Sequence, residues 1–469
     1  MQQLQARYGK RYKWWVMLTV MTGTMTMSLS STIVNVALPD VMETFPVSHT
    51  MVQWMVTAFL ASMAIGMLLN VWMVDRFGPR VTYMGALLVF MAAALAGGLA
   101  VNFSMLIFVR VVQGLIAGMV QPLAMLMLYA VFPANQRGQA MGLYAMGVVL
   151  GPTAGPVAGG VLVDWWSWRA VFLVVLPFCL AAFYLGRTFL SRPDSAPPVH
   201  RRLDIPGLLL LGGWMLALLW GLSEGPLSGW NSSAVIAALI AALVLFLIFT
   251  RHQLRSLAPL LALRIFSYKG FTAAFTVAML TGAGLYGSVY LLPMLVQTAM
   301  GESASAAGML LMPAGLAMAL SFPVIGQLTD RILPKILVTG GLVLFALSSI
   351  VLSEASADTS LMLIALMAAL GRVGLAMTMP PVVIGAMSIV PQDMINQATG
   401  LISFARQFGG SLGVMLSAIL LQENTLWTTS LGILPGFPGY QDAFALLALL
   451  YLIGLYPMAR MKSPGQTAT

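Results

Sequence analysis

The residues best placed to do chemistry in this sequence are single charges inside long apolar runs. Arg110, Arg372 and Arg406 each stand within such a run, while the 14 Asp and Glu residues lie between the runs or near their ends. If the runs cross a membrane, a central guanidinium costs roughly 2.5–3.5 kcal/mol, so each arginine should face protein or water. Buried cations without a buried acid predict a cavity of positive potential. For Arg406 the alternative is a structural bond to backbone carbonyls of a neighbouring helix.

Polar uncharged side chains form a stripe in the first apolar run. Thr24, Ser28, Ser31 and Asn35 follow one another at i, i+4, i+7 and i+11, so they share one face of a helix. This face either contacts a ligand or water, which we favour, or joins two helices by hydrogen bonds of under about 1 kcal/mol each. Other residues predicted to line the same cavity are Gln53, Trp54, Gln113, Tyr286 and Tyr290.

Enzymatic and metal chemistry find little support in the sequence. The single cysteine, Cys179, lies in an apolar run, and the three histidines, His49, His200 and His252, lie in polar connections. These residues do not supply a disulfide framework, a metal cluster, or a nucleophile paired with a base. We therefore predict a protein that is not an enzyme and needs no cofactor.

The composition is that of a membrane protein. Hydrophobic residues make up 59% of the 469 residues and charged residues 8%, against about 45–50% and 25% in soluble domains. The mean hydropathy is +0.92. The net charge of +9 comes from short basic clusters between apolar runs, which indicates membrane topology and no nucleic-acid partner. The predicted fold class is all-α and polytopic.

Apolar runs long enough to cross a bilayer, at about 20 residues a span, define the predicted topology. The fourteen predicted spans are 14–38, 51–74, 80–101, 105–131, 138–162, 169–190, 205–223, 232–250, 270–296, 304–329, 335–353, 360–388, 395–421 and 440–459. With the N-terminus inside, every Lys and Arg except Arg110, Arg169, Arg372 and Arg406 falls in a cytoplasmic segment. Both termini are therefore predicted to be cytoplasmic. The run after Lys13 is expected to be a retained span, because it lacks a signal-peptide cleavage site.

Two long polar stretches divide the spans into six, two and six. We expect an N-terminal six-helix bundle (1–190), a cytoplasmic linker (191–204), an extra two-helix hairpin (205–250), a cytoplasmic loop (251–269) and a C-terminal six-helix bundle with a short tail (270–469). An internal repeat supports this division, because VDRFGPR (74–80) after span 2 is echoed by TDRILPK (329–335) after span 10. Duplicated six-helix units are common among membrane transporters.

Several motifs together resemble a known family. They are LSSTIVNVALP (29–39), VDRFGPR (74–80), FVRVVQGLIAG (108–118), GVVLGPTAGPVAGG (147–160), WSWRAVF (166–172), GQLTDR (326–331) and RQFGGSLGV (406–414). In their order and placement they resemble the fourteen-span drug/proton antiporter branch of the major facilitator superfamily, with its EmrB-like and QacA-like exporters. The resemblance implies efflux of small amphipathic compounds across the inner (plasma) membrane by alternating access and proton antiport. EmrB-like relatives also imply a periplasmic adaptor and an outer-membrane channel as partners.

The repeated loop motif predicts a cytoplasmic gate. Its charged residues are Asp75, Arg76 and Arg80 in the first half and Asp330 and Arg331 in the second. Charges at helix ends can bind a neighbouring bundle and must release it when the protein opens. The alternative is an ordinary positive-inside loop. The first copy departs from the family pattern, with Val71 where a glycine is usual and Pro79 where a basic residue is usual.

Small residues in span 5 predict a bending helix. Gly147, Gly151, Gly155 and Gly159 recur every four residues and so line one face. Another helix can approach this face closely. Pro152 and Pro156 interrupt the backbone hydrogen bonds and bend the rod. The alternative is simple tight packing, but the resemblance to the antiporter motif favours bending.

An acid usual in the family is missing from span 1. Ser30 stands where many relatives carry an Asp, so we expect anionic, zwitterionic or neutral substrates rather than quaternary cations. The predicted proton carriers are the peripheral acids Asp40, Asp164 and Asp204. The alternatives are a narrow exporter of an anionic metabolite or siderophore-like compound, and a membrane sensor or scaffold that transports nothing.

Overall fold

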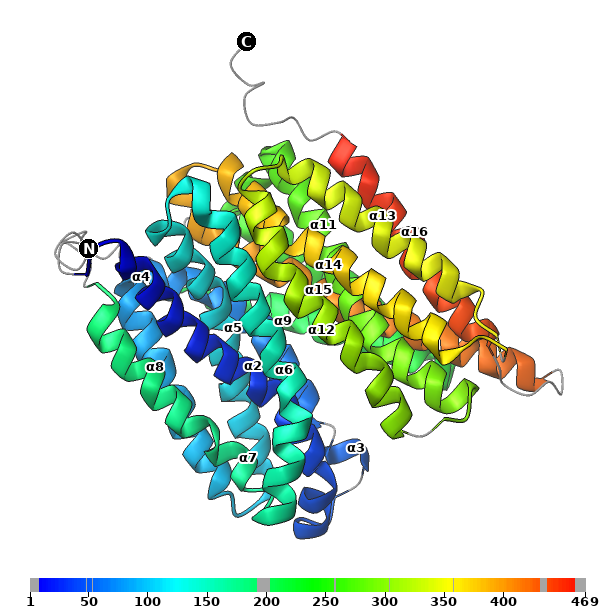
Figure 1. Cartoon of the computed structure of the whole chain (residues 1–469). Coiled ribbons are helices and arrows are strands. Elements are labelled where there is room, and N and C mark those ends of the chain that lie inside the picture. The colour runs from blue at the N-terminus through cyan, green and yellow to red at the C-terminus, as the bar shows by residue number, and fades with distance from the viewer. Residues whose placement is uncertain are drawn as a thin grey trace. The chain divides into compact units, whose positions relative to one another are not determined.

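A computed structural model of the chain is helical throughout its described part (Figure 1). It describes residues 8–47, 49–52, 54–191, 203–256, 259–302, 304–356, 358–430 and 437–459. Apolar runs form helices because every backbone amide inside a bilayer must find its partner within its own segment. The predicted all-α class is confirmed for these ranges.

The chain divides into two compact units. Unit 1 holds Met1–Leu203 with Ile395–Phe404, and unit 2 holds Asp204–Met394 with Ala405–Thr469. The helices of unit 1 are α2 (Tyr12–Thr44), α3 (His49–Val52), α4 (Trp54–Gly98), α5 (Phe103–Val131), α6 (Arg137–Trp165), α7 (Ala170–Leu173) and α8 (Val175–Phe189). The helices of unit 2 are α9 (Ile205–Ser228), α10 (Ser233–Arg255), α11 (Lys269–Met294), α12 (Ala304–Thr329), α13 (Pro334–Ser353), α14 (Leu361–Ile389) and α16 (Pro438–Ala459). The remaining helix, α15 (Ile395–Ser430), begins in unit 1 and continues into unit 2.

Twelve helices in the described ranges are long and apolar enough to cross a membrane. The sequence predicts fourteen spans, and two elements account for the difference. The predicted spans 51–74 and 80–101 lie within the single helix α4, and α6, which holds the predicted span 138–162, is not among the twelve. The predicted count of fourteen spans is therefore not confirmed, although every predicted span falls on helical residues.

Helix α4 is interrupted at Gly78. Its 45 residues would form a rod of about 68 Å at 1.5 Å per residue, roughly twice the hydrocarbon thickness of a bilayer. Gly78 has φ 77° and ψ 162°, which are not helical angles, and glycine adopts positive φ without steric cost. The Thr82 hydroxyl donates to the carbonyl of Gly78 at 2.8 Å and to that of Met73 at 3.0 Å, which ties the two segments together.

The pair α9 and α10 is the least buried of the long helices. Only 22% and 17% of their most apolar segments are buried, against 61% for α2. Trp214 of α9 packs between Phe246 of α10 and Phe408 of α15, with ring centroids 5.1 Å apart in both contacts. The pair thus turns most of its apolar surface outward, as expected for helices in contact with lipid. Helix α10 extends to Arg255, so His252 lies in its last turn and not in the predicted polar connection.

Candidate functional site

Arg110 of α5 is fully buried within unit 1. Its residue is 0% exposed, and its Nε donates to the carbonyl of Met55 at 2.9 Å. Its Nη1 donates to the carbonyl of Ser30 at 3.1 Å and to Gln113 Oε1 at 3.3 Å. The guanidinium also lies 4.2 Å from the ring centre of Phe59. We call these five residues the Arg110 site.

A second buried arginine occupies unit 2. Arg372 of α14 is 6% exposed, and its Nη1 donates to the carbonyl of Leu285 at 3.3 Å. A cavity of about 10 Å³ beside the guanidinium is lined by Ser288, Ser348 and Ser349, among others. This is room for about one water-sized molecule. We call Arg372, Leu285 and the three serines the Arg372 site.

The two arginine sites have the same construction within their own units. Arg110 lies on the fourth predicted span and reaches a carbonyl of α2, the first. Arg372 lies on the fourth predicted span of the second half and reaches a carbonyl of α11, the first of that half. In the described residues neither guanidinium has a carboxylate within ion-pair distance. Each unit therefore carries one buried cation held mainly by neutral acceptors.

The other predicted cavity residues have mixed environments. Ser28 is buried, Ser31 is half-buried and donates to the carbonyl of Ser28, and Asn35 is exposed. Trp54 is 51% exposed at the start of α4, and Gln53 lies outside the described residues. The Thr24 hydroxyl donates a hydrogen bond to the carbonyl of Val20 in its own helix. The residues of the polar stripe on α2 therefore do not share one environment.

In unit 2, Tyr286, Tyr290 and Arg406 are half-buried. The Tyr286 hydroxyl donates to Gln407 Oε1 at 3.3 Å. Its ring packs against Gly410, where a Cβ would collide with it. Around Arg406 the backbones of α11 and α15 are in close contact, because a Cβ at Gly282 would meet the Arg406 carbonyl. The glycines after Arg406 therefore serve close helix packing.

Of the predicted gate residues of the first half, Asp75 contacts the start of α15. Asn396 donates from Nδ2 to Asp75 Oδ1 at 3.0 Å and to the carbonyl of Val71 at 3.2 Å. The Arg76 guanidinium lies 5.7 Å from the Trp72 ring, and Arg80 donates to the carbonyl of Arg187 at 2.9 Å. The three charges therefore have partners on three different elements.

Close approach at the predicted gate comes from a glycine that the sequence motif does not contain. A Cβ at Gly400 of α15 would lie 3.1 Å from the carbonyl of Met67 and 3.2 Å from Val71 Cγ2. Gly400 thus supplies the space that a glycine at position 71 was expected to provide. In the second half, Arg331 is exposed beyond the end of α12, and Asp330 is half-buried.

The glycine face of α6 lies against α2. A Cβ at Gly151 would lie 2.8 Å from the carbonyl of Met25, and one at Gly159 would lie 2.8 Å from that of Ile33. A Cβ at Gly147 would meet the Met21 side chain, and one at Gly155 would collide with Thr32 Oγ1. Pro156 has no N–H to donate to the carbonyl four residues before it, which is that of Pro152. The Thr32 hydroxyl of α2 donates to this carbonyl at 3.0 Å. Pro156 lies within α6.

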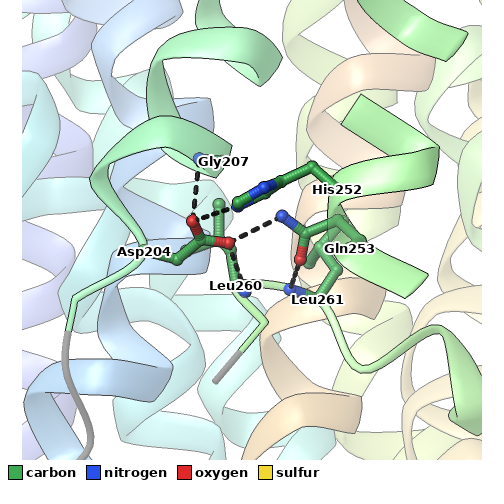
Figure 2. Close-up of polar contacts among 6 residues, drawn as sticks. All are labelled: Asp204, Gly207, His252, Gln253, Leu260 and Leu261. Atoms are coloured by element: carbon green, nitrogen blue, oxygen red, sulfur yellow. Dashed lines mark hydrogen bonds and ion pairs between the residues drawn. The ribbon is translucent and has the colours of Figure 1, made fainter. Parts of the chain in front are cut away.

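Asp204 is the centre of a hydrogen-bond cluster at the base of the α9–α10 pair (Figure 2). Its Oδ1 accepts from the Gly207 amide at 2.9 Å and lies 2.6 Å from His252 Nε2. Its Oδ2 accepts from Gln253 Nε2 at 2.7 Å and from the Leu260 amide at 3.1 Å. Gln253 Oε1 in turn accepts from the Leu261 amide at 2.9 Å.

These contacts oppose the predicted role of Asp204 as a proton carrier. Burial by itself raises the pKa of the Asp204 carboxyl, but the hydrogen bonds from His252, Gly207, Gln253 and Leu260 outweigh it and hold the pKa below its ordinary value of 3.8. Protonating Asp204 would weaken the hydrogen bonds that stabilise its ionised form, which disfavours loading a proton there. The geometry instead makes Asp204 a structural anchor.

Replacing Asp204 with asparagine tests this anchor. Asparagine can still cap α9. Its side-chain NH2 group, however, would replace Oδ2, which accepts hydrogen bonds from Gln253 and Leu260. We therefore expect a loss of about 1–3 kcal/mol in the free energy of unfolding at pH 7. Because the folded-state pKa is lowered, the carboxylate stabilises the protein above pH 3.8 and loses this effect as the pH falls further. Thermal unfolding from pH 7 to pH 3 measures the difference, with Glu224→Gln on the same hairpin as the control. An equal melting temperature at pH 7 would contradict the role.

The two other predicted proton carriers are more accessible. Asp40 is half-buried near the end of α2, and Asp164 is exposed near the end of α6. In the described ranges no three His, Cys, Asp or Glu residues gather closely enough to hold a metal ion.

Sequence reasoning missed Asn70, Asn396 and Gln253. Asn70 is buried in α4 and donates to Asn396 Oδ1 at 3.4 Å. The available signal for Asn70 is a lone amide inside an apolar run, because a buried amide needs partners. Asn396 and Gln253 stand at the ends of apolar runs among other polar residues, and nothing in their spacing distinguishes them.

Comparisons with known proteins agree with this architecture of long apolar helices around buried charges. The class defined by fold and site is a polytopic α-helical membrane protein. The model of the Major Facilitator Superfamily matches residues 20–414, so the chain belongs to that family of membrane transporters. The resemblance seen in the motifs is confirmed at this level.

Relatives and a solved structure extend the comparison. The chain is 31% identical to the tetracenomycin C resistance and export protein of Streptomyces glaucescens, over 87% of this chain and 76% of that protein. It is 30% identical to the multidrug resistance protein Stp of Mycobacterium tuberculosis, over 84% and 73% of the two chains. The crystal structure of the human organic anion transporter MFSD10 shares the fold, with a TM-score of 0.66 and 14% identity over 95% of this chain and 99% of that one.

Proposed function

We propose that this chain is a secondary active exporter of small amphipathic compounds, working by alternating access with proton antiport. Relatives named for tetracenomycin export and multidrug resistance support this substrate class. The single observation that carries the substrate preference is a buried arginine in each unit without a carboxylate partner among the described residues. Such sites favour anionic, zwitterionic or neutral compounds over cations.

We propose fourteen spans in the plasma membrane with both termini in the cytoplasm. Splitting α4 at Gly78 gives two segments of ordinary span length, and α6 has 29 residues. Added to the other eleven candidates, these make fourteen spans. They group as a six-helix bundle at 1–190, a linker at 191–204, a hairpin at 205–250, a loop at 251–269 and a second bundle at 270–469.

Cysteine labelling tests the topology. The native Cys179 is buried, so an impermeant maleimide reports on introduced cysteines. Ser256→Cys is expected to be shielded in intact cells and Ser356→Cys to be labelled, because the Lys/Arg distribution places them on opposite sides. Labelling of Ser256→Cys from outside would contradict the fourteen-span arrangement, and labelling of both after permeabilisation is the control.

The glycine face of α6 supports alternating access. Helices that touch through backbone and small side chains can slide or bend with little steric cost, and the prolines weaken α6 itself. The contact of Asp75 with Asn396 would serve as a gate in unit 1, together with Arg76 and Arg80. Asp330 and Arg331 would be the corresponding gate residues of unit 2. Because α15 continues into unit 2, movement of that unit during transport would act on this contact.

Proton coupling is assigned to Asp40 and Asp164. They are the two other predicted carriers, and both lie near helix ends, where Asp40 is half-buried and Asp164 is exposed. A periplasmic adaptor and an outer-membrane channel are partners that the EmrB-like resemblance implies, alongside the lipid bilayer. Substrate residues are proposed at the Arg110 and Arg372 sites, with Arg406, Tyr286 and Tyr290.

Transport into everted vesicles from an efflux-deficient host tests the function. A matched anionic and cationic dye would be followed with an imposed pH gradient, using vesicles without the protein as the control. We expect gradient-dependent accumulation, faster for the anionic dye, that a protonophore abolishes. Dye uptake that does not depend on the pH gradient would contradict proton antiport.

The second candidate is a narrow exporter of an anionic metabolite or siderophore-like compound, favoured by the same two buried arginines. It predicts transport of one compound and no protection in a broad drug-susceptibility panel. A sensor or scaffold predicts no flux of any dye. The panel and the vesicle assay together separate these three functions.

A further inference from the structure

Two hydrogen-bond donors at the Arg110 site have no acceptor among the residues that the structure describes. They are Nη2 of Arg110 and Nε2 of Gln113, and both residues are 0% exposed. The other nitrogens of Arg110 are bonded, since Nε reaches Met55 and Nη1 reaches Ser30 and the Oε1 of Gln113. The unsatisfied groups are therefore confined to one side of one guanidinium and the amide next to it.

Leaving these donors unsatisfied is costly. A buried polar group without a partner costs about 1–3 kcal/mol, and more if it is charged. The neutral carbonyls and the Phe59 ring, 4.2 Å away, lower the energy of the guanidinium but do not neutralise it. An uncompensated buried charge is among the most destabilising features in proteins. Among the described residues no carboxylate lies within ion-pair distance of Arg110.

We propose that the Arg110 site binds one small monovalent anion, held by Arg110 Nη2 and Gln113 Nε2. Both unsatisfied groups are donors, so the missing partner is an acceptor, and the uncompensated charge is positive, so the acceptor is an anion. A halide and the carboxylate of a transported compound share this chemistry. The halide source is independent of the proposed export function, whereas the carboxylate source rests on it.

Ser30 allows the anion to be replaced by a covalently attached one. Its Oγ lies 3.5 Å from Arg110 Nη1, so an aspartate at this position would place a carboxylate against the guanidinium. Ser30→Asp should therefore remove the need for a bound anion. Ser30→Asn is the matched control, because asparagine has nearly the same size as aspartate and carries no charge.

Thermal unfolding of the purified full-length protein tests the site without requiring transport. Sodium chloride or bromide replaces sodium methanesulfonate at constant ionic strength, and formate serves as the carboxylate probe. For the native protein and Ser30→Asn we expect a saturable rise in melting temperature of roughly 2–4 °C. Ser30→Asp and Arg110→Gln should show no rise, and formate should compete with halide. If Arg110→Gln does not fold, the comparison of Ser30→Asp with Ser30→Asn still tests the proposal.

Bromide soaked into crystals locates the anion directly, with an anomalous peak expected beside Arg110 Nη2 and Gln113 Nε2. If chloride, bromide and formate all leave the melting temperature of the native protein unchanged, the proposal is overturned. The two donors would then be hydrogen-bonded to an ordered water. An equal rise in Ser30→Asp would also overturn it, because the effect would then lie elsewhere. Halide binding without formate competition assigns the site to halide alone. If the native protein binds halide but transports no dye, the proposed function is contradicted and the anion site is still supported.

Discussion

Replacing Gly155 with leucine is expected to reduce transport at least fivefold while leaving the protein folded in the membrane. Even a Cβ at this position would collide with Thr32 Oγ1 and lie 3.1 Å from the amide of Ile33, so a leucine must push α6 away from α2. Overpacking of this kind costs about 1–3 kcal/mol. If one transport state needs the close contact, that cost lowers its population roughly 5- to 150-fold.

The measurement is the initial rate of dye uptake into everted vesicles, normalised to the amount of protein in the membrane. Gly160→Leu is the matched control, because a Cβ at Gly160 meets nothing within 4 Å, and its rate should stay near that of the native protein. Gly155→Ala should fall between the two. Equal rates for Gly155→Leu and Gly160→Leu would reduce the glycine face to incidental packing.

Replacing Arg372 with alanine is expected to shift substrate preference toward cations. The change removes a charge that is 6% exposed and lines a small cavity with three serines, and charge interactions are strong away from bulk water. We expect the ratio of anionic to cationic dye efflux to fall at least tenfold, which corresponds to about 1.4 kcal/mol. Ser30→Asp should move the ratio in the same direction, because it adds a negative charge at the Arg110 site.

Two further variants separate charge from packing. Arg372→Lys keeps the charge and should retain most of the preference, whereas Arg331→Ala removes an exposed charge at the end of α12 and should leave the ratio unchanged. Both dyes must be tested with the same imposed pH gradient. If neither Arg372→Ala nor Ser30→Asp alters the ratio, the positive-cavity hypothesis is wrong and the arginines are structural.

Features that depend on local sequence were predictable. The positions of the long helices follow from runs of apolar residues, because the bilayer thickness and the helical rise set their length. The shared face of Gly147, Gly151, Gly155 and Gly159 follows from helical periodicity alone, and family membership follows from motifs read in order. The internal break of α4 was anticipated only as a loop, and its conformation depends on Gly78.

Partners of the buried polar groups were not predictable. Arg110 bonds carbonyls of Met55 and Ser30, and a carbonyl is present at every residue, so no residue type signals which one will be used. Asp204 was named from sequence as a proton carrier, yet its ligands include a backbone amide of Leu260, 56 residues further along the chain. This contact gives it a structural role.

The sequence by itself determined that this protein is a helical membrane transporter with lone arginines at membrane depth, because length, hydropathy and charge are properties of single segments. Only the tertiary structure decided that Asn396 meets Asp75, that Gly400 provides the close approach at Val71, and that one donor each of Arg110 and Gln113 lacks an acceptor among the described residues. These depend on which helices touch and in what register. That information arises from packing between segments distant in the chain.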